Sequence, residues 1–177
     1  EEIISIFTVF LFRGHDTTRQ TLTNCTRALA ADKALFRQLR EDPNQIKLFI
    51  EEVIRLYSPA NATPRYAVKD TEIAGVNIPA NSQIYLCWGS GNRDPQLFEN
   101  ADQMQCPRAD KAQHMGFGAG IHFCVGMRLA RAQLQYTMEA LLQRYSDISL
   151  TVPESELQYA PAINLRALVS LPIRCTI

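Results

Sequence analysis

Residues 117–126 read Phe117-Gly118-Ala119-Gly120-Ile121-His122-Phe123-Cys124-Val125-Gly126. This segment places one cysteine in a loop with three glycines, and an amphipathic segment begins directly after it at Met127. Glycine permits a positive φ and lets a bulky partner approach the backbone closely. A loop that opens into a helix offers free N–H groups and the positive end of the helix dipole, which stabilise a thiolate. The pattern therefore indicates a thiolate ligand beside a flat or large partner, and haem iron is one metal that accepts a thiolate.

Five positions of this segment also match a known signature. Phe117, Gly120, His122, Cys124 and Gly126 have the spacing Phe-x-x-Gly-x-(His/Arg)-x-Cys-x-Gly, so the segment resembles that of the cytochrome P-450 superfamily. The resemblance implies that Cys124 is the axial ligand of a haem iron and that His122 reaches a haem propionate. The alternative is a buried structural cysteine before a helix, which would not explain the surrounding glycines.

Composition excludes several classes of protein. The chain has 177 residues, enough for a substantial core, and 18 Lys and Arg residues balance 18 Asp and Glu residues, so no overall field attracts nucleic acid or anionic lipid. The five cysteines are scattered and contain no Cys-x-x-Cys pair, which argues against a disulfide framework or a zinc site and favours a reducing compartment. No apolar run reaches the roughly 18 residues that a membrane-spanning helix needs.

Hydrophobic periodicity and helix breakers predict a mainly α-helical chain, and the resemblance implies small β-sheets beside the helices, an α+β fold. We expect helices over about residues 3–31, 33–41, 45–57 and 125–144, and a strand over residues 83–88. Asn81, just before this strand, tolerates a positive φ. Beyond Pro153 the pattern is one of short strands and turns to the end of the sequence.

The first predicted helix carries a second segment that resembles the family. Arg13-Gly14-His15-Asp16-Thr17-Thr18 is similar to the (Ala/Gly)-Gly-x-(Asp/Glu)-Thr-Thr segment of the helix that crosses the distal side of the haem. The resemblance implies that Gly14 lies at the haem, that Thr17 hydrogen-bonds dioxygen or its water, and that Asp16 relays protons. The alternative is an ordinary helix in which threonine donates to the i−4 carbonyl and aspartate faces water.

Arg13 departs from the family pattern, which usually has a small residue at this position. Because positions i and i+4 share one face of a helix, Arg13 is expected on the side of Thr17. A cation there would reduce the room for substrate and attract an anionic group such as a carboxylate. The alternative is that the arginine extends away along the helix into solvent.

Two further groups of residues follow the family. Glu52 and Arg55 lie three apart on a predicted helix and can pair, and they resemble the Glu-x-x-Arg ion pair, with Arg108 as its third member. This network would be structural. In the extended segment after Pro59, the resemblance implies that Ala62 and Thr63 face the substrate pocket and that Arg65 pairs with a haem propionate. A surface arginine on an edge strand is the alternative for Arg65.

The resemblance covers essentially all of residues 1–177, but only the C-terminal part of the family domain, from the distal haem helix to the chain end. We therefore expect a single haem-binding region that is a fragment of a longer domain. The implied cofactor is haem b (iron protoporphyrin IX). The residues implied to bind it are Gly14, Arg65, Phe117, Gly118, Gly120, His122, Cys124 and Gly126.

The implied reaction is monooxygenation, in which one oxygen atom from dioxygen enters a small organic substrate. Electrons would come ultimately from NAD(P)H through a ferredoxin or flavoprotein. The style of the motifs resembles that of bacterial, cytoplasmic members, with no nucleic-acid partner and no membrane evident in this chain. The alternatives are a haem-thiolate peroxygenase or isomerase, against which Asp16 and Thr17 argue, and a fragment that does not hold haem.

Overall fold

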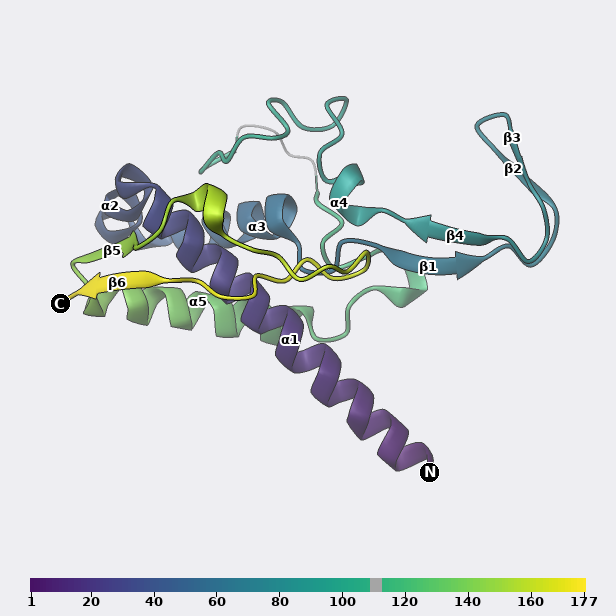
Figure 1. Cartoon of the computed structure of the whole chain (residues 1–177), viewed down its shortest axis with the longest axis horizontal. Coiled ribbons are helices and arrows are strands. Elements are labelled where there is room, and N and C mark those ends of the chain that lie inside the picture. Colours follow the sequence, from purple (N-terminus) through teal and green to yellow (C-terminus); the bar gives the residue numbers. More distant parts are fainter. Residues whose placement is uncertain (109–112) are drawn as a thin grey trace.

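The structure, a computed structural model, describes residues 1–108 and 113–177 (Figure 1). The helices in these ranges are α1 (Glu2–Ala31), α2 (Lys33–Glu41), α3 (Ile46–Tyr57), α4 (Trp88–Gly91) and α5 (Met127–Arg144), with 3-10 turns η1 (Pro43–Gln45), η2 (Gly120–His122) and η3 (Glu154–Glu156). The strands are β1 (Thr63–Tyr66), β2 (Thr71–Ile73), β3 (Val76–Ile78), β4 (Gln83–Leu86), β5 (Asp147–Leu150) and β6 (Ile173–Thr176). These elements confirm the predicted helical fold with small sheets.

Asp32 accounts for the turn between α1 and α2. Its N–H donates to the Ala28 carbonyl at 3.1 Å, and this bond ends α1. Its carboxylate accepts hydrogen bonds from the N–H groups of Ala34 and Leu35 at 2.9 and 3.0 Å. A carboxylate at this position satisfies free N–H groups and opposes the positive end of the helix dipole. The chain can therefore leave α1 and begin α2 within a single residue.

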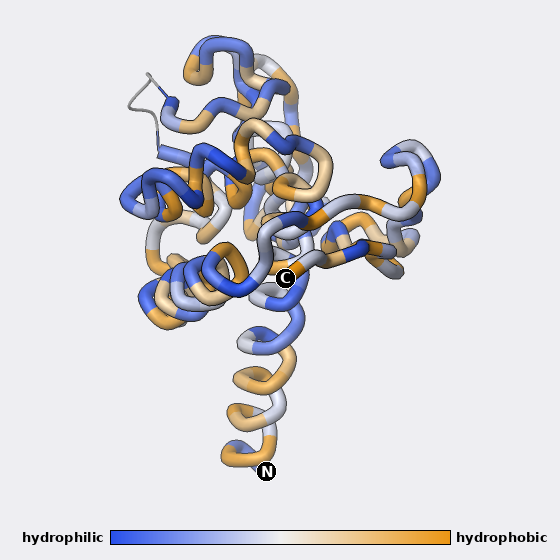
Figure 2. The backbone as a smooth tube through the Cα atoms, turned by 90° about the vertical axis from the view of Figure 1, so that its left-hand side faces the viewer, coloured by the Kyte–Doolittle hydropathy of each residue, from blue (hydrophilic) through white to orange (hydrophobic). Residues whose placement is uncertain are grey.

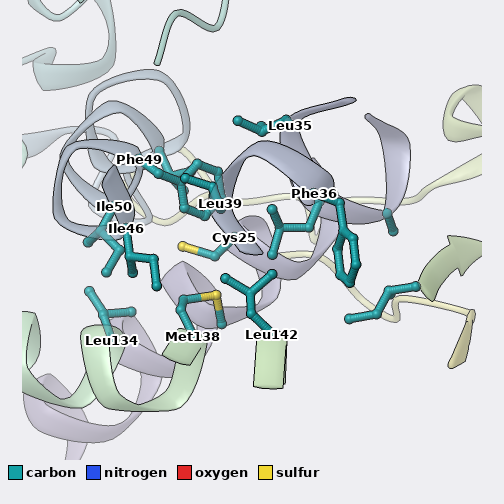
Figure 3. Close-up of a cluster of buried hydrophobic side chains, with 14 of the residues drawn as sticks. Cys25, Leu35, Phe36, Leu39, Ile46, Phe49, Ile50, Leu134, Met138 and Leu142 are labelled. Carbon is teal, nitrogen blue, oxygen red and sulfur yellow. The ribbon is translucent and has the colours of Figure 1, made fainter. Parts of the chain in front are cut away.

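The helices meet in one hydrophobic core, shown in part in Figure 3. The C-terminal half of α1 and one face each of α2, α3 and α5 supply apolar side chains that are almost completely buried. Members of the cluster include Cys25, Leu29, Phe36, Leu39, Ile46, Phe49, Ile50, Val53, Leu134, Met138, Leu142 and Ile148. Burying one such aliphatic or aromatic side chain is worth about 1.5–3 kcal/mol. This core holds α5, which follows residues 113–126 directly, and α3, against which Gly116 of that segment fits closely.

The strands form three separate two-stranded antiparallel sheets, β1 with β4, β2 with β3, and β5 with β6. The β2–β3 hairpin turns at Ala74 and Gly75, whose φ values are 50° and 79°, and it lies at the opposite end of the molecule from the β5–β6 sheet (Figure 1). Asn81 has a φ of 65°, as its residue type allows. The strand predicted over residues 83–88 ends earlier, at Leu86, because residues from Trp88 onward form the short helix α4.

The N-terminal half of α1 extends away from the body of the molecule (Figures 1 and 2). Its turns are strongly hydrophobic in Figure 2, and large apolar side chains from Ile3 to Phe12 are exposed. The buried residues of α1 begin only at Gln20. Among the described residues, no helix combines the length and apolar character needed to cross a membrane.

Candidate functional site

The segment before α5 folds into a tight loop around Cys124. The Cys124 N–H donates to the Phe117 carbonyl at 3.0 Å, which closes the loop, and the Cys124 carbonyl accepts from Met127, the first residue of α5, at 3.4 Å. Gly118 and Gly120 have φ values of 74° and 66°, a conformation that glycine adopts at no steric cost. A Cβ atom added to Gly126 would lie 4.0 Å from the Cys124 sulfur. The loop therefore presents an exposed thiol at the beginning of a helix.

The other cysteines have different surroundings. Burial raises the pKa of the Cys25 thiol, which lies in the core. Burial, with a smaller contribution from the charge of Glu52, raises the pKa of Cys106 to about 11. Cys87 and Cys175 are exposed; Cys87 lies just after β4 as the N-cap of the four-residue helix α4, and Cys175 lies within β6. The described cysteines are all free, and among them Cys124 is the exposed one that lies in a loop with positive-φ glycines before the long helix α5.

Exposed apolar residues stand on both sides of Cys124 in the sequence. Ile121 and Val125 are 97% and 90% exposed, and His122 is exposed in η2 between them. Gly118 packs against this turn, since an added Cβ atom would lie 3.7 Å from the His122 carbonyl oxygen. The loop thus offers one soft sulfur ligand, one imidazole and an apolar surface on the same short segment.

The residues predicted on α1 lie in its outer half. Arg13 and Gly14 are exposed, while Asp16 and Thr17 are half-buried. The Thr17 hydroxyl donates to the Arg13 carbonyl at 2.8 Å, and Asp16 pairs with Arg19 at 3.4 Å. Within residues 1–108 and 113–177, no hydrogen bond or ion pair joins residues 13–17 to residues 117–126. Thr17 therefore has the i−4 back-bond of an ordinary helix, and its oxygen keeps lone pairs that can accept a hydrogen bond.

Glu52, Arg55 and Arg108 form a buried network. Arg55 donates to the Glu52 carboxylate through Nε and Nη2, both at 2.8 Å, and Arg108 Nη1 donates to it at 3.1 Å. Arg55 Nη1 also donates to the carbonyls of Asn92 and Ala101 at 2.8 and 2.6 Å. The Asn92 side chain in turn accepts from the Met115 N–H at 2.6 Å. The network thus fixes α3 to the chain that leads into the cysteine loop, which is a structural role.

The residues predicted around β1 are covered to different degrees. Ala62 is only 2% exposed and belongs to the core. The Thr63 hydroxyl accepts a hydrogen bond from the Trp88 indole at 3.1 Å. Arg65 is half-buried, and its guanidinium donates to the Pro64 carbonyl at 2.8 Å. Their roles toward a substrate or a propionate stay predictions.

Sequence reasoning missed a second ion cluster, formed by Glu51, His114 and Arg131. Arg131 donates to the two Glu51 carboxylate oxygens at 2.7 and 2.6 Å, and His114 Nε2 lies 2.9 Å from the same carboxylate. Burial opposes ionisation of Glu51, but hydrogen bonds from His114 and Arg131 outweigh it and lower its pKa to about 2. Only a weak indication of this cluster was present in the sequence, namely a second glutamate directly before Glu52 and a histidine three residues before Phe117.

The donor set fits a haem better than a metal ion held by several side chains. Within the described parts of the chain, no group of three or more His, Cys, Asp or Glu side chains could hold a metal ion. Haem iron needs only one protein ligand, and Cys124 offers an accessible sulfur. Apolar Ile121 and Val125 suit a porphyrin face, while His122 and Arg65 suit its carboxylates.

Comparison with known proteins identifies the family of this chain. Residues 1–159 match the family "Cytochrome P450". The chain is 37% identical over 173 residues to the biotin biosynthesis cytochrome P450 of Bacillus subtilis (strain 168), covering 98% of this chain and 43% of that protein. It is 35% identical over 175 residues to the mycinamicin IV hydroxylase/epoxidase of Micromonospora griseorubida, covering 98% of this chain and 44% of that protein.

Among solved structures, P450BioI in complex with a hexadec-9Z-enoic acid ligated acyl carrier protein matches with a TM-score of 0.86 at 37% identity. The match covers 92% of this chain and 42% of that one. The chain described here therefore belongs to the cytochrome P450 family. It spans about 43% of the length of the first of these curated relatives.

Proposed function

We propose that this chain forms the haem-binding part of a bacterial haem-thiolate monooxygenase with haem b as its cofactor. The observation that carries the proposal is the exposed, unpaired Cys124, held in a glycine loop at the start of α5 in a chain of this family. A haem bound there supplies the activation of dioxygen. The relative named as a mycinamicin IV hydroxylase/epoxidase supports oxygen insertion as the reaction.

Each residue of the site has a role that follows from its chemistry. Cys124 provides the thiolate ligand, and the N–H bond to Phe117 keeps its backbone in place. His122 and Arg65 donate hydrogen bonds to the propionates. Gly14 would lie beside the haem on α1, where the space next to its Cα is open, since an added Cβ atom would meet nothing within 4 Å.

Thr17 and Asp16, both on α1, would hold and transfer the protons that the reaction needs. Because the Thr17 hydrogen is committed to the Arg13 carbonyl, Thr17 acts as a hydrogen-bond acceptor for water or for a protonated oxygen of the reactant. Asp16 is paired with the exposed Arg19, and a carboxylate so placed can exchange protons between solvent and the site when the pair opens. Both roles favour dioxygen chemistry over a peroxygenase or isomerase, which needs no such relay.

An electron donor of the ferredoxin or flavoprotein class would dock on the side of α3 and α5. A hollow of about 360 Å³ lies there and is lined by Lys47, Arg128 and Arg131, with Glu51 as the acidic member. Three cations against one paired carboxylate favour a partner with an acidic surface. The electrons would come ultimately from NAD(P)H, and the protein would work in the cytoplasm.

The substrate is a small organic molecule. The relative solved with a hexadecenoic acid ligated carrier protein supports an apolar acyl chain as one candidate class. Arg13 and Thr63 would contact the substrate, with Arg13 selecting for charge, whereas Ala62 is 2% exposed and is covered by the rest of the chain.

A carbon monoxide spectrum of the reduced, haem-loaded protein tests the proposal. The parent should give the red-shifted band of a thiolate-ligated haem, and Cys124→Ala should lose it. Cys87→Ser and Cys175→Ser are matched controls because both thiols are also exposed and free. A parent without this band, or a Cys124→Ala variant that keeps it, would refute the assignment. Product formed with reductase and dioxygen, but not with peroxide alone, separates a monooxygenase from a peroxygenase.

A further inference from the structure

The Glu51 carboxylate joins three segments that are far apart in the sequence. It accepts from Arg131 of α5 in a bidentate pair, and it lies 2.9 Å from His114 Nε2 in the segment before the cysteine loop. Bidentate arginine–carboxylate pairs fix orientation as well as distance. Glu51 itself belongs to α3 and is therefore anchored in the core.

His114 passes this constraint to the backbone of the loop. The Gly116 N–H donates to His114 Nδ1 at 3.1 Å, so Nδ1 is the acceptor and Nε2 carries the proton toward Glu51. Gly116 also fits closely against α3, because an added Cβ atom would lie 2.4 Å from Ile54 Cγ2. The chain is thus held at His114 and Gly116 immediately before Phe117.

Arg131 constrains the side chain of Phe117. Its guanidinium lies 4.9 Å from the centre of the Phe117 ring, and the His114 ring lies 6.0 Å from that ring on a tilted plane. A cation over an aromatic face is attractive, and fixing both partners of Glu51 fixes this ring. The carbonyl of the same phenylalanine accepts the Cys124 N–H at 3.0 Å.

We propose that Glu51 is a positioning residue for Cys124: by holding His114 and Arg131 it fixes Phe117, whose carbonyl accepts the Cys124 N–H. The cluster is separate from the Glu52 network, which reaches the same segment through Asn92 and Met115. The inference rests on the proposed function, because that function gives the position of the Cys124 sulfur its importance.

The test compares the full-length, haem-loaded parent with Glu51→Gln, which keeps the side-chain shape and removes the charge. Hydrogen exchange read by mass spectrometry should be roughly ten- to hundred-fold faster at the Cys124 amide. Exchange in the core part of α5, residues 134–142, should stay within about twofold of the parent. The reduced carbon monoxide complex should also lose part of its thiolate band. Glu72→Gln, an exposed glutamate of β2, is the matched control.

Unchanged exchange at Cys124 would overturn the proposal, and so would an equal acceleration in the core of α5, since that is the result of a merely structural role. Arg131→Lys serves as a second variant that keeps the charge and removes the bidentate pair. It should give a smaller acceleration at Cys124, and it decides the question if Glu51→Gln does not fold. A parent that lacks the thiolate band refutes the proposed function, whereas a normal parent with an indistinguishable variant refutes the role of Glu51.

Discussion

Glu51 and Glu52 are consecutive residues of α3, yet their carboxylates bind different arginines. Glu51 Oε2 lies 2.6 Å from Arg131 Nη2, and Glu52 Oε1 lies 2.8 Å from Arg55 Nη2. Successive helical residues point about 100° apart, so neighbouring glutamates can serve two separate networks. Both networks reach the segment that precedes Cys124, one through His114 and the other through Asn92.

The Glu52 network should matter chiefly for stability. Glu52→Gln leaves the guanidinium of Arg55, which is 2% exposed, without its counter-charge. Removing one partner of a buried ion pair costs about 3–5 kcal/mol of unfolding free energy. Urea unfolding of the whole protein measures this loss. Glu72→Gln on the exposed strand β2 should change stability by less than about 0.5 kcal/mol, and an equal effect of the two substitutions would contradict a structural role for Glu52.

Glu51 should add an acid-dependent component to stability. Its pKa falls from 4.5 to about 2 in the folded protein because the bonds from His114 and Arg131 outweigh burial. Between these values the unfolded state binds more protons, so the contribution is complete above pH 4.5 and is lost as the pH falls to 2. Unfolding free energies measured across this range should fall less steeply in Glu51→Gln than in the parent. Parallel curves would show that Glu51 does not titrate with folding.

Gly116 should resist substitution. In Gly116→Ala the new methyl group would lie 2.4 Å from Ile54 Cγ2 and 3.3 Å from the Ile54 carbonyl oxygen. Overpacking of this kind costs about 1–3 kcal/mol. Chemical denaturation measures the loss, and a double-mutant cycle with Ile54→Ala identifies its cause. Ile54→Ala removes the obstructing methyl group, so the double variant should lose less unfolding free energy than the two single variants lose together. If the two losses simply add, the steric clash of the new methyl group does not involve the Ile54 side chain.

The local patterns predicted the elements well and the long-range contacts poorly. Helical periodicity and the break at Pro43 and Asn44 indicated α1, α2 and α3 within one or two residues. The predicted start of the last helix was two residues early, because the chain at Val125 still belongs to the loop that closes between Cys124 and Phe117. Periodicity reports which residues share a face, but not what that face meets.

The same limit applies to the site. The spacing of Glu52 and Arg55 is local, so their pairing could be predicted from the helix alone. The pairing of Glu51 with His114 and Arg131 joins residues 63 and 80 positions apart and depends on how α3 packs on α5. Arg13 and Thr17, like Glu52 and Arg55, could be placed from local spacing, because a helix sets them one turn apart whatever lies opposite them.

Thr17 should control coupling in the whole enzyme. Thr17→Ala removes the oxygen that accepts a hydrogen bond and the back-bond to Arg13, but it removes no haem ligand. We expect normal haem binding, with a larger share of the electrons released as hydrogen peroxide rather than used for product. Product and peroxide measured per NAD(P)H consumed give the ratio. Thr17→Ser keeps the hydroxyl group and should remain close to the parent, and equal coupling in all three proteins would remove Thr17 from the mechanism.

Arg13 should select substrates by charge. It is exposed on α1, one turn before Thr17. A charge-assisted hydrogen bond to a substrate carboxylate is worth about 1.5–3 kcal/mol, or roughly ten- to hundred-fold in affinity. Spectral titration of the whole enzyme with a long-chain carboxylic acid and its neutral amide measures this preference.

The parent should bind the acid more tightly, and Arg13→Gln should bind both ligands alike. Arg37→Gln, an exposed arginine on α2, is the control and should keep the preference. Loss of pocket volume alone predicts a different result, because Arg13→Ala would then bind apolar ligands of either kind more tightly. If parent and Arg13→Gln rank acid and amide identically, the arginine extends into solvent and takes no part in selection.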